Sequence, residues 1–224
     1  MKTPKNQSLS PSLQVALDLL NLDDALKIAS QVAPYVDILE AGTPLIKSEG
    51  IKAVRTLKKT YPDKLICADL KIADAGYLEV RMAAKAGADI VTVLADAYNI
   101  TIEETLRAAS EFKIDIMADL IMSRRPKKRL EEIKVINYKG KKLSYALVHS
   151  GLDRQESRHS PLSELESMIS VQKRPELALA GGIQLIDVPN ILKFSLNIII
   201  VGGAITKAQE PGLIAKEFRK AING

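Results

Sequence analysis

Residues 65–76 read LICADLKIADAG and carry the strongest structural signal in the chain. An apolar run ends at Asp69, Lys71 follows two residues later, and Asp74 comes two residues before a glycine. Short runs rich in Leu, Ile and Ala that end in polar residues and lead into helical periodicity are typical of a parallel strand and its following helix. This stretch therefore predicts one βα unit.

The same pattern recurs from end to end of the chain. We predict strands near residues 13–18, 36–41, 64–69, 89–95, 114–120, 143–149, 176–180 and 196–201. We predict helices at residues 22–32, 45–60, 77–86, 102–112, 126–135, 161–172, 185–193 and 207–222. Eight βα units with no strand left over favour an α/β fold of one closed (β/α)₈ TIM barrel over an open doubly wound sheet.

Length and composition fit one such domain. The chain has 224 residues, 46% of them hydrophobic, which is enough to bury a full core. Residues 1–12, MKTPKNQSLSPS, are polar and lack the apolar core of a secretory signal. We therefore expect a flexible N-terminal arm at 1–12, a catalytic barrel at 13–224, and a cytoplasmic location. The most apolar run, 196–201, is far shorter than the roughly 20 residues that span a bilayer.

Charge and cysteine content narrow the function classes. The single cysteine, Cys67, cannot form an intramolecular disulfide and is interpreted as a small core residue. No Cys/His cluster has zinc-site spacing, so a metal here would be a hard cation held by oxygen. The net charge of +5 suits anionic partners, but the absence of Trp and the presence of only three Phe disfavour nucleic acid. The basic stretch 124–142 is interpreted as a solvated helix face followed by a turn at 139–142, with a partner-binding patch as the alternative.

Ionisable residues stand at the ends of five predicted strands: Asp18, Glu40, Asp69, Asp119 and His149. The active sites of TIM barrels lie at the carboxyl ends of the strands, so these side chains are expected to meet at one rim. A lone carboxylate at a strand end is more often a helix cap, but five converging groups make that interpretation strained.

The D-x-K-x-x-D pattern formed by Asp69, Lys71 and Asp74 is the most specific feature of this rim. Strand alternation puts Asp69 and Lys71 on the same inward face, about 7 Å apart, with Asp74 on the following loop. An ammonium group flanked by two carboxylates stays charged and can stabilise a developing enolate or deliver a proton. The alternative is a structural ion-pair network in the mouth of the barrel.

Two further groups of residues suggest a metal and a phosphate. Glu40 and Asp69 could present oxygen ligands to Mg²⁺, which acts as a Lewis acid on an enediolate. His149 is a candidate general acid or base, whereas His159 lies in a polar loop and is interpreted as solvated. Glycine pairs follow the last two predicted strands, where many barrels bind phosphate through backbone N–H groups: Gly181, Gly182, Gly202 and Gly203.

The motifs that contain these residues resemble those of the 3-hexulose-6-phosphate synthase family, within the orotidine monophosphate decarboxylase suprafamily. They are LQVALDL, VDILEAGTPLIKSEG, ADLKIADAG, GADIVTVLADA, LVHSGLDRQ, LAGGI and IIVGGAIT, and the resemblance runs from about residue 13 to the C-terminus. The resemblance implies an aldolase that joins formaldehyde to D-ribulose 5-phosphate, or runs the reaction backwards. It also implies a homodimer with shared active sites.

The resemblance further implies a role for each matching residue. Asp18 would contact substrate hydroxyls, Glu40 and Asp69 would hold Mg²⁺, and His149 would transfer protons. Lys71 and Asp74 would stabilise the enediolate, with Asp74 reaching into the neighbouring subunit. Gly182 and Gly203 would lie at the phosphate.

Two alternatives remain open. The related 3-keto-L-gulonate-6-phosphate decarboxylase (KGPDC) shares the barrel, the metal and the D-x-K-x-x-D motif. It typically carries an arginine three residues after the strand-six histidine and another in the final phosphate loop, where this chain has Leu152 and Gly203. The other alternative is a non-catalytic sugar-phosphate or nucleic-acid binding protein, which would use residues 124–142 and show steep salt dependence.

Overall fold

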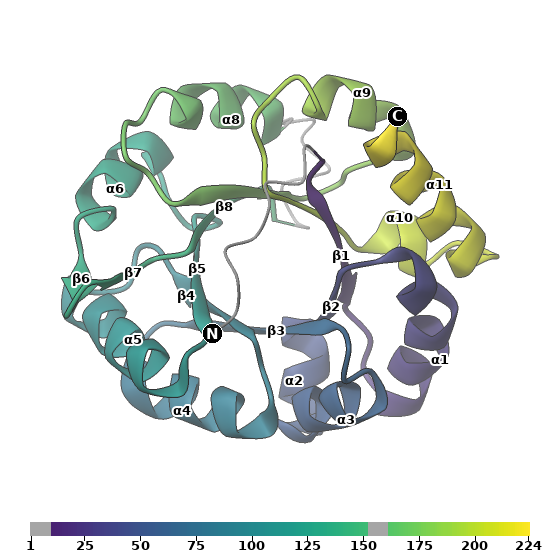
Figure 1. Ribbon diagram of the computed structural model, residues 1–224, viewed down its shortest axis with the longest axis horizontal. Coiled ribbons are helices and arrows are strands. Elements are labelled where there is room, and N and C mark those ends of the chain that lie inside the picture. The colour runs from purple at the N-terminus through teal and green to yellow at the C-terminus, as the bar shows by residue number, and fades with distance from the viewer. Residues whose placement is uncertain (1–9, 152–160) are drawn as a thin grey trace.

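The computed structural model describes residues 10–151 and 161–224. Within them, eight parallel strands close into a barrel in the order β1-β10-β9-β8-β5-β4-β3-β2, and helices surround it (Figure 1). The strands are β1 (Ser12–Leu17), β2 (Ile38–Ala41), β3 (Leu65–Ile72), β4 (Ile90–Leu94), β5 (Asp115–Asp119), β8 (Tyr145–His149), β9 (Glu176–Ala180) and β10 (Ile198–Val201). The predicted single-domain (β/α)₈ barrel is confirmed.

Some predictions from the sequence fall on residues outside the described ranges. Residues 1–9 lie outside the described residues, so the N-terminal arm at 1–12 stays a prediction, although β1 already begins at Ser12. Leu152 and His159 also lie outside them. None of the helices in the described part of the chain is long and apolar enough to cross a membrane.

The helical layer agrees with prediction except where glycine or proline breaks it. The helix predicted at 45–60 is two helices, because Gly50 adopts a left-handed φ of 65° between them. The helix predicted at 207–222 begins four residues later, at Pro211, and a separate short helix lies before the predicted range, at Gly203–Thr206. The α-helices are α1 (Leu22–Val32), α2 (Thr43–Glu49), α3 (Lys52–Thr60), α4 (Gly76–Ala86), α5 (Asn99–Phe112), α6 (Pro126–Ile133), α8 (Pro161–Ile169), α9 (Val188–Ile191), α10 (Gly203–Thr206) and α11 (Pro211–Asn223). Short 3₁₀ helices, η1 (Ala33–Tyr35) and η2 (Leu185–Asp187), precede β2 and α9.

The predicted turn at residues 139–142 is shorter than expected. The structure forms a small hairpin there, with β6 (Asn137–Tyr138) paired antiparallel to β7 (Lys141–Lys142). Lys139 and Gly140, with φ of 47° and 89°, make the two-residue turn. Two positive φ values are what a hairpin loop of this length requires, so only these two residues turn and the next two pair.

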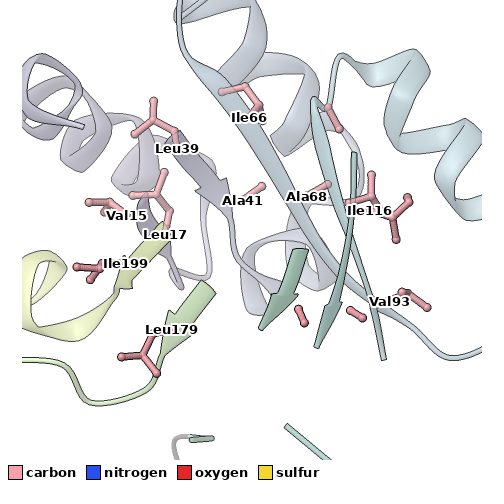
Figure 2. Packing of buried hydrophobic residues seen from close by; sticks show 14 of the residues in the cluster. Val15, Leu17, Leu39, Ala41, Ile66, Ala68, Val93, Ile116, Leu179 and Ile199 are labelled. Atoms are coloured by element: carbon pink, nitrogen blue, oxygen red, sulfur yellow. The ribbon is translucent and has the colours of Figure 1, made fainter. Parts of the chain in front are cut away.

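Strand alternation divides the core into two layers. Side chains such as Val15, Leu39, Ile66 and Ile199 point outward and pack against the helices (Figure 2). Inward-facing side chains fill the barrel as a separate cluster: Ala16, Ile38, Cys67, Ile90, Met117, Tyr145, Leu147, Ala178, Ala180, Ile198 and Ile200. The next inward positions, toward the carboxyl ends of the strands, are polar. The candidate site therefore lies directly above this inward-facing apolar cluster, which we call the apolar floor of the barrel.

Candidate active site

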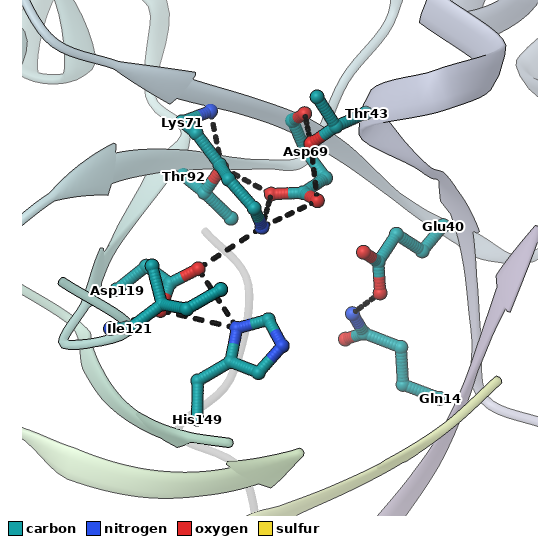
Figure 3. Close-up of polar contacts among 9 residues, drawn as sticks. All are labelled: Gln14, Glu40, Thr43, Asp69, Lys71, Thr92, Asp119, Ile121 and His149. Atoms are coloured by element: carbon teal, nitrogen blue, oxygen red, sulfur yellow. Dashed lines mark hydrogen bonds and ion pairs between the residues drawn. The ribbon is translucent and has the colours of Figure 1, made fainter. Parts of the chain in front are cut away.

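Four strands supply the polar layer above the apolar floor. Glu40 comes from β2, Asp69 and Lys71 from β3, Asp119 from β5 and His149 from β8. Figure 3 shows these side chains converging from the surrounding strands, as the pattern of strand ends predicted. The structure therefore brings these five side chains together at one end of the barrel.

Lys71 lies at the centre of this group. Its Nζ is 2.7 Å and 2.9 Å from the two carboxylate oxygens of Asp69 and 3.0 Å from Oδ2 of Asp119. Burial disfavours the ammonium, but the charges of Asp69 and Asp119 outweigh it and raise the pKa of Lys71, so the side chain is charged at neutral pH.

The local backbone aims Lys71 into the site. The register between β3 and β4 shifts between Ala68 and Ile72, and Lys71 has a φ of 48°. Its backbone N–H donates to Oγ1 of Thr92 at 2.9 Å instead of continuing a regular ladder. A left-handed φ at a residue other than glycine costs free energy and is often found at functional sites.

The expectation that Asp74 flanks Lys71 within one chain is wrong. The second carboxylate at Lys71 is Asp119, while the exposed Asp74 accepts a hydrogen bond from the N–H of Ala75 at 2.7 Å. The shifted register turns Lys71 across the barrel toward β5, away from the loop that follows β3.

Asp69 is held by two threonines as well as by Lys71. Oγ1 of Thr43 donates to Oδ2 at 2.7 Å, and Oγ1 of Thr92 donates to Oδ1 at 2.8 Å. Both threonines come from neighbouring elements, α2 and β4. Every oxygen of this buried carboxylate therefore has a donor, which fixes its direction.

Asp119 connects Lys71 to His149 and has no exposed surface. Its oxygens lie 3.0 Å and 3.2 Å from Nδ1 of His149, and Oδ1 also accepts from the N–H of Ile121 at 2.9 Å. Burial alone would raise the pKa of Asp119, but the hydrogen bond and charge of His149, together with Lys71, lower it. Sequence reasoning placed Asp119 at the rim and gave it no role, because its partners lie 30 and 48 residues away in the chain.

The contact with Asp119 sets the orientation of His149. An ionised carboxylate only accepts hydrogen bonds, so we assign a proton to Nδ1, and Nε2 is the nitrogen that can exchange a proton with a substrate. The His149 side chain keeps 17% of its surface exposed, which leaves it reachable from the mouth of the barrel. This pairing of a histidine with a buried carboxylate is suited to proton transfer.

Glu40 and Asp18 add negative charge on the opposite side. Glu40 is buried and accepts from Nε2 of Gln14 at 2.5 Å. Burial, followed by the charges of Asp69 and Asp18, raises the pKa of Glu40 well above its ordinary value. Asp18 is solvent-exposed at the mouth, and the protein that surrounds it, together with Asp69, raises its pKa as well.

Glycine at two positions leaves room for Asp18. A Cβ on Gly42 would lie 2.1 Å from Oδ1 of Asp18, and a Cβ on Gly202 would lie 3.6 Å from its Oδ2. The space beside Asp18 is therefore lined by backbone. The predicted loops after β9 and β10 meet this rim, and Gly181 and Gly182 have left-handed φ values of 109° and 67°.

Glu40 and Asp69 provide carboxylate oxygens, which are suitable ligands for a magnesium ion. Across the described residues, no group of three or more His, Cys, Asp or Glu side chains is arranged to hold a metal. Mg²⁺, however, commonly uses one or two protein carboxylates and keeps several water or substrate oxygens. Lys71 has Asp119 as a second partner, so it keeps an ion pair if Asp69 turns to a cation.

Comparison with known proteins identifies the family. Residues 11–218 match the model of the Orotidine 5'-phosphate decarboxylase / HUMPS family. The chain belongs to this family. A 3-hexulose-6-phosphate synthase from Mycobacterium gastri is 39% identical over 212 residues, covering 94% of this chain and 99% of the relative.

Solved structures of similar proteins have the same fold as this chain. The structure of 3-hexulose-6-phosphate synthase from Salmonella typhimurium has a TM-score of 0.89 at 34% identity and covers 94% of this chain and 98% of its own. The structure of a KGPDC from Streptococcus mutans, solved as a complex, has a TM-score of 0.86 at 27% identity, covering 95% and 97%. The predicted resemblance, and the prediction that the chain is an enzyme, are confirmed.

Proposed function

We propose that this member of the family is an aldolase that joins formaldehyde to D-ribulose 5-phosphate to form 3-hexulose 6-phosphate, or catalyses the reverse cleavage. The observation that carries the proposal is the chain of contacts from Lys71 through Asp119 to His149, which puts a charged donor and a histidine that can transfer a proton in one site. The synthase relatives at 35–39% identity support the substrate assignment.

In this proposal His149 transfers the proton and Lys71 stabilises the charge that develops on the substrate. Nε2 of His149 removes a proton from the carbon beside the substrate ketone, and Asp119 stabilises the resulting imidazolium. The ammonium of Lys71 stabilises the negative charge that develops on the substrate oxygens. The deprotonated carbon then attacks the formaldehyde carbon, and the new alkoxide takes up the proton from the imidazolium of His149, which regenerates the base.

The remaining predicted residues bind the substrate in this proposal. A Mg²⁺ ion held by Glu40 and Asp69 would supply Lewis-acid polarisation of the substrate oxygens. Asp18 accepts hydrogen bonds from sugar hydroxyls at the mouth. The backbone N–H groups of the glycine loops bind the phosphate, and these loops contain Gly181, Gly182, Gly202 and Gly203.

A homodimer is part of the proposal because of the surface around Asp74. Four large apolar side chains are exposed on α4 and at the start of α5: Leu78 (63%), Met82 (44%), Tyr98 (82%) and Ile100 (63%). These two helices pack closely together, so the four residues lie near the loop that carries Asp74. Exposed apolar groups of this size favour a protein interface, and a second copy placed there would receive Asp74.

Decarboxylation of 3-keto-L-gulonate 6-phosphate is the second candidate function, since KGPDC has the same fold. The presence of Gly203 in place of the arginine expected in the final phosphate loop favours the aldolase. A non-catalytic binding protein is disfavoured by the buried charges of Asp69, Lys71 and Asp119, which are costly unless they are used.

The decisive experiment is an assay of the purified chain with D-ribulose 5-phosphate and formaldehyde. We expect formaldehyde consumption that requires Mg²⁺ and stops with a chelator, and no comparable release of CO₂ from 3-keto-L-gulonate 6-phosphate. Consumption that is insensitive to the chelator would remove the metal from the proposal. Faster decarboxylation than condensation would select KGPDC activity.

A further inference from the structure

Gln14 is a polar residue in the apolar floor of the barrel. It lies on β1 with no exposed surface and pairs in register with Ile38 of β2 and Ile200 of β10. The inward side chains at this depth are otherwise aliphatic, aromatic or sulfur-containing. A glutamine here needs a reason, because burying an amide is unfavourable unless it is hydrogen-bonded.

Only one end of the Gln14 amide group is hydrogen-bonded, and its partner is Glu40. Nε2 donates to Oε2 of Glu40 at 2.5 Å, while Oε1 has no hydrogen-bond partner among the described residues. We assign the nitrogen to this contact because a carboxylate that ligates a cation is ionised and can only accept a hydrogen bond. A half-satisfied buried amide is unfavourable relative to an apolar side chain of the same shape, so stability alone does not account for it.

The group that benefits is Glu40. Its side chain has three rotatable torsions, so without a fixed partner the carboxylate would be free to turn away from the site. The bond from Gln14 fixes one carboxylate oxygen and leaves the other directed toward the centre of the site, on the side of Asp69 and Lys71 (Figure 3). That is the direction in which a cation shared with Asp69 would lie.

We propose that Gln14 is a positioning residue that sets the divalent-cation affinity of the Glu40 and Asp69 pair. The inference rests on the proposed metal-dependent function. Partners of metal-ligating carboxylates that orient them typically change metal affinity or activity by about 10–100-fold when they are removed. Gln14 acts through Glu40 and makes no contact with substrate in this scheme.

The test is the dissociation constant for Mn²⁺, measured on the purified apo chain by electron paramagnetic resonance without substrate. Gln14→Met keeps the length of the side chain and removes the donor. We expect Mn²⁺ binding to weaken by about 10–100-fold, kcat to fall with it, and the KM for D-ribulose 5-phosphate at saturating metal to change much less.

The matched control is Ile198→Val, a change in the same interior cluster that leaves Gln14 and Glu40 untouched. It should keep wild-type Mn²⁺ affinity even if the unfolding temperature drops. Wild-type affinity in Gln14→Met, or an equal loss in Ile198→Val, would overturn the role of Gln14. If Gln14→Met does not fold, Gln14→Leu is measured in the same way and must show the same loss.

Mn²⁺ binding by the wild-type chain distinguishes an error in the proposed metal-dependent function from an error in the role of Gln14. If the wild-type chain binds no Mn²⁺ at millimolar concentration, the metal itself is wrong, and the inference falls with it. If the wild-type chain binds Mn²⁺ and Gln14→Met binds it equally well, only the role of Gln14 is wrong.

Discussion

Asp119 is the residue on which the proton-transfer half of the site depends. Replacing it with Asn keeps the shape but removes the charge that holds both Lys71 and His149. We expect Asp119→Asn to lower kcat by about 10²–10⁴-fold, the usual contribution of a positioned acid or base, with a smaller effect on KM. Asp115→Asn is the control, because Asp115 is at the opposite end of β5 and bonds Lys141. A kcat within threefold of wild type would exclude Asp119 from catalysis.

The lowered pKa of Asp119 also predicts how stability depends on pH. A carboxyl group whose pKa is lower in the folded than in the unfolded chain contributes stability above its unfolded pKa of about 3.9, and the contribution is lost as pH falls through the folded pKa. The free energy of unfolding in urea, measured from pH 7 to pH 3, should therefore fall less steeply for Asp119→Asn than for wild type. Equal slopes would contradict the assignment.

Glu40 is expected to change the free energy of unfolding with pH in the opposite direction to Asp119. Its raised pKa means that the folded chain binds the proton more tightly, so its ionised form destabilises the fold increasingly as pH rises through the folded pKa. Glu40→Gln can still accept from Gln14 but carries no charge. We expect a thermal unfolding temperature a few degrees above wild type at pH 8, at about 2–4 °C per kcal/mol for a chain of this length, and no gain below pH 4. Aldolase activity should be lost in the same variant.

At the scale of elements, the close approach of α4 and α5 depends on Gly76. A Cβ there would lie 2.4 Å from the carbonyl oxygen of Thr101 and 2.9 Å from Cγ2 of Thr105. Gly76→Ala should force the helices apart and destabilise the chain by about 1–3 kcal/mol, as overpacking does. The measurement is thermal unfolding, with Gly203→Ala as the control, because a Cβ at Gly203 meets only Lys207 atoms at 3.7 Å. Equal unfolding temperatures would show that the helices adapt.

The elements that could be predicted are those whose own pattern decides them. Val, Ile and Leu in short runs located every strand of the barrel to within a few residues. The break at Gly50 and the pairing of Lys141–Lys142 were missed, because a single left-handed glycine or a two-residue turn leaves little trace in periodicity. The partnership of Asp119 with Lys71 is long-range and depends on the register shift in β3, which no local pattern encodes.

At the scale of the whole molecule, an active site formed by two chains of a dimer can be tested by complementation between variants. Asp74 and Lys71 of one chain would serve different active sites of a dimer, so Asp74→Asn and Lys71→Ala should each be inactive. Co-expressed, they should regain about one quarter of wild-type activity, because half of the dimers are mixed and each mixed dimer has one intact site.

The control for this complementation is the double variant Asp74→Asn/Lys71→Ala co-expressed with wild type. Its mixed dimers have no intact site, since each site lacks either the lysine or the aspartate. Activity per chain should then stay near one quarter of wild type, while independent sites would give one half. Absence of complementation together with a monomeric mass by light scattering would rule out the shared site.

The position of Cys67 has a consequence for an enzyme that handles a reactive aldehyde. The only sulfhydryl of the chain is fully buried beneath Glu40 and Asp69, and burial, followed by the charges of those two carboxylates, raises its pKa. Thiolates add readily to electrophiles, whereas a protonated and enclosed thiol is inert. A chain with the proposed activity can therefore turn over formaldehyde without offering it a sulfur nucleophile, which removes one route of covalent modification by its own substrate.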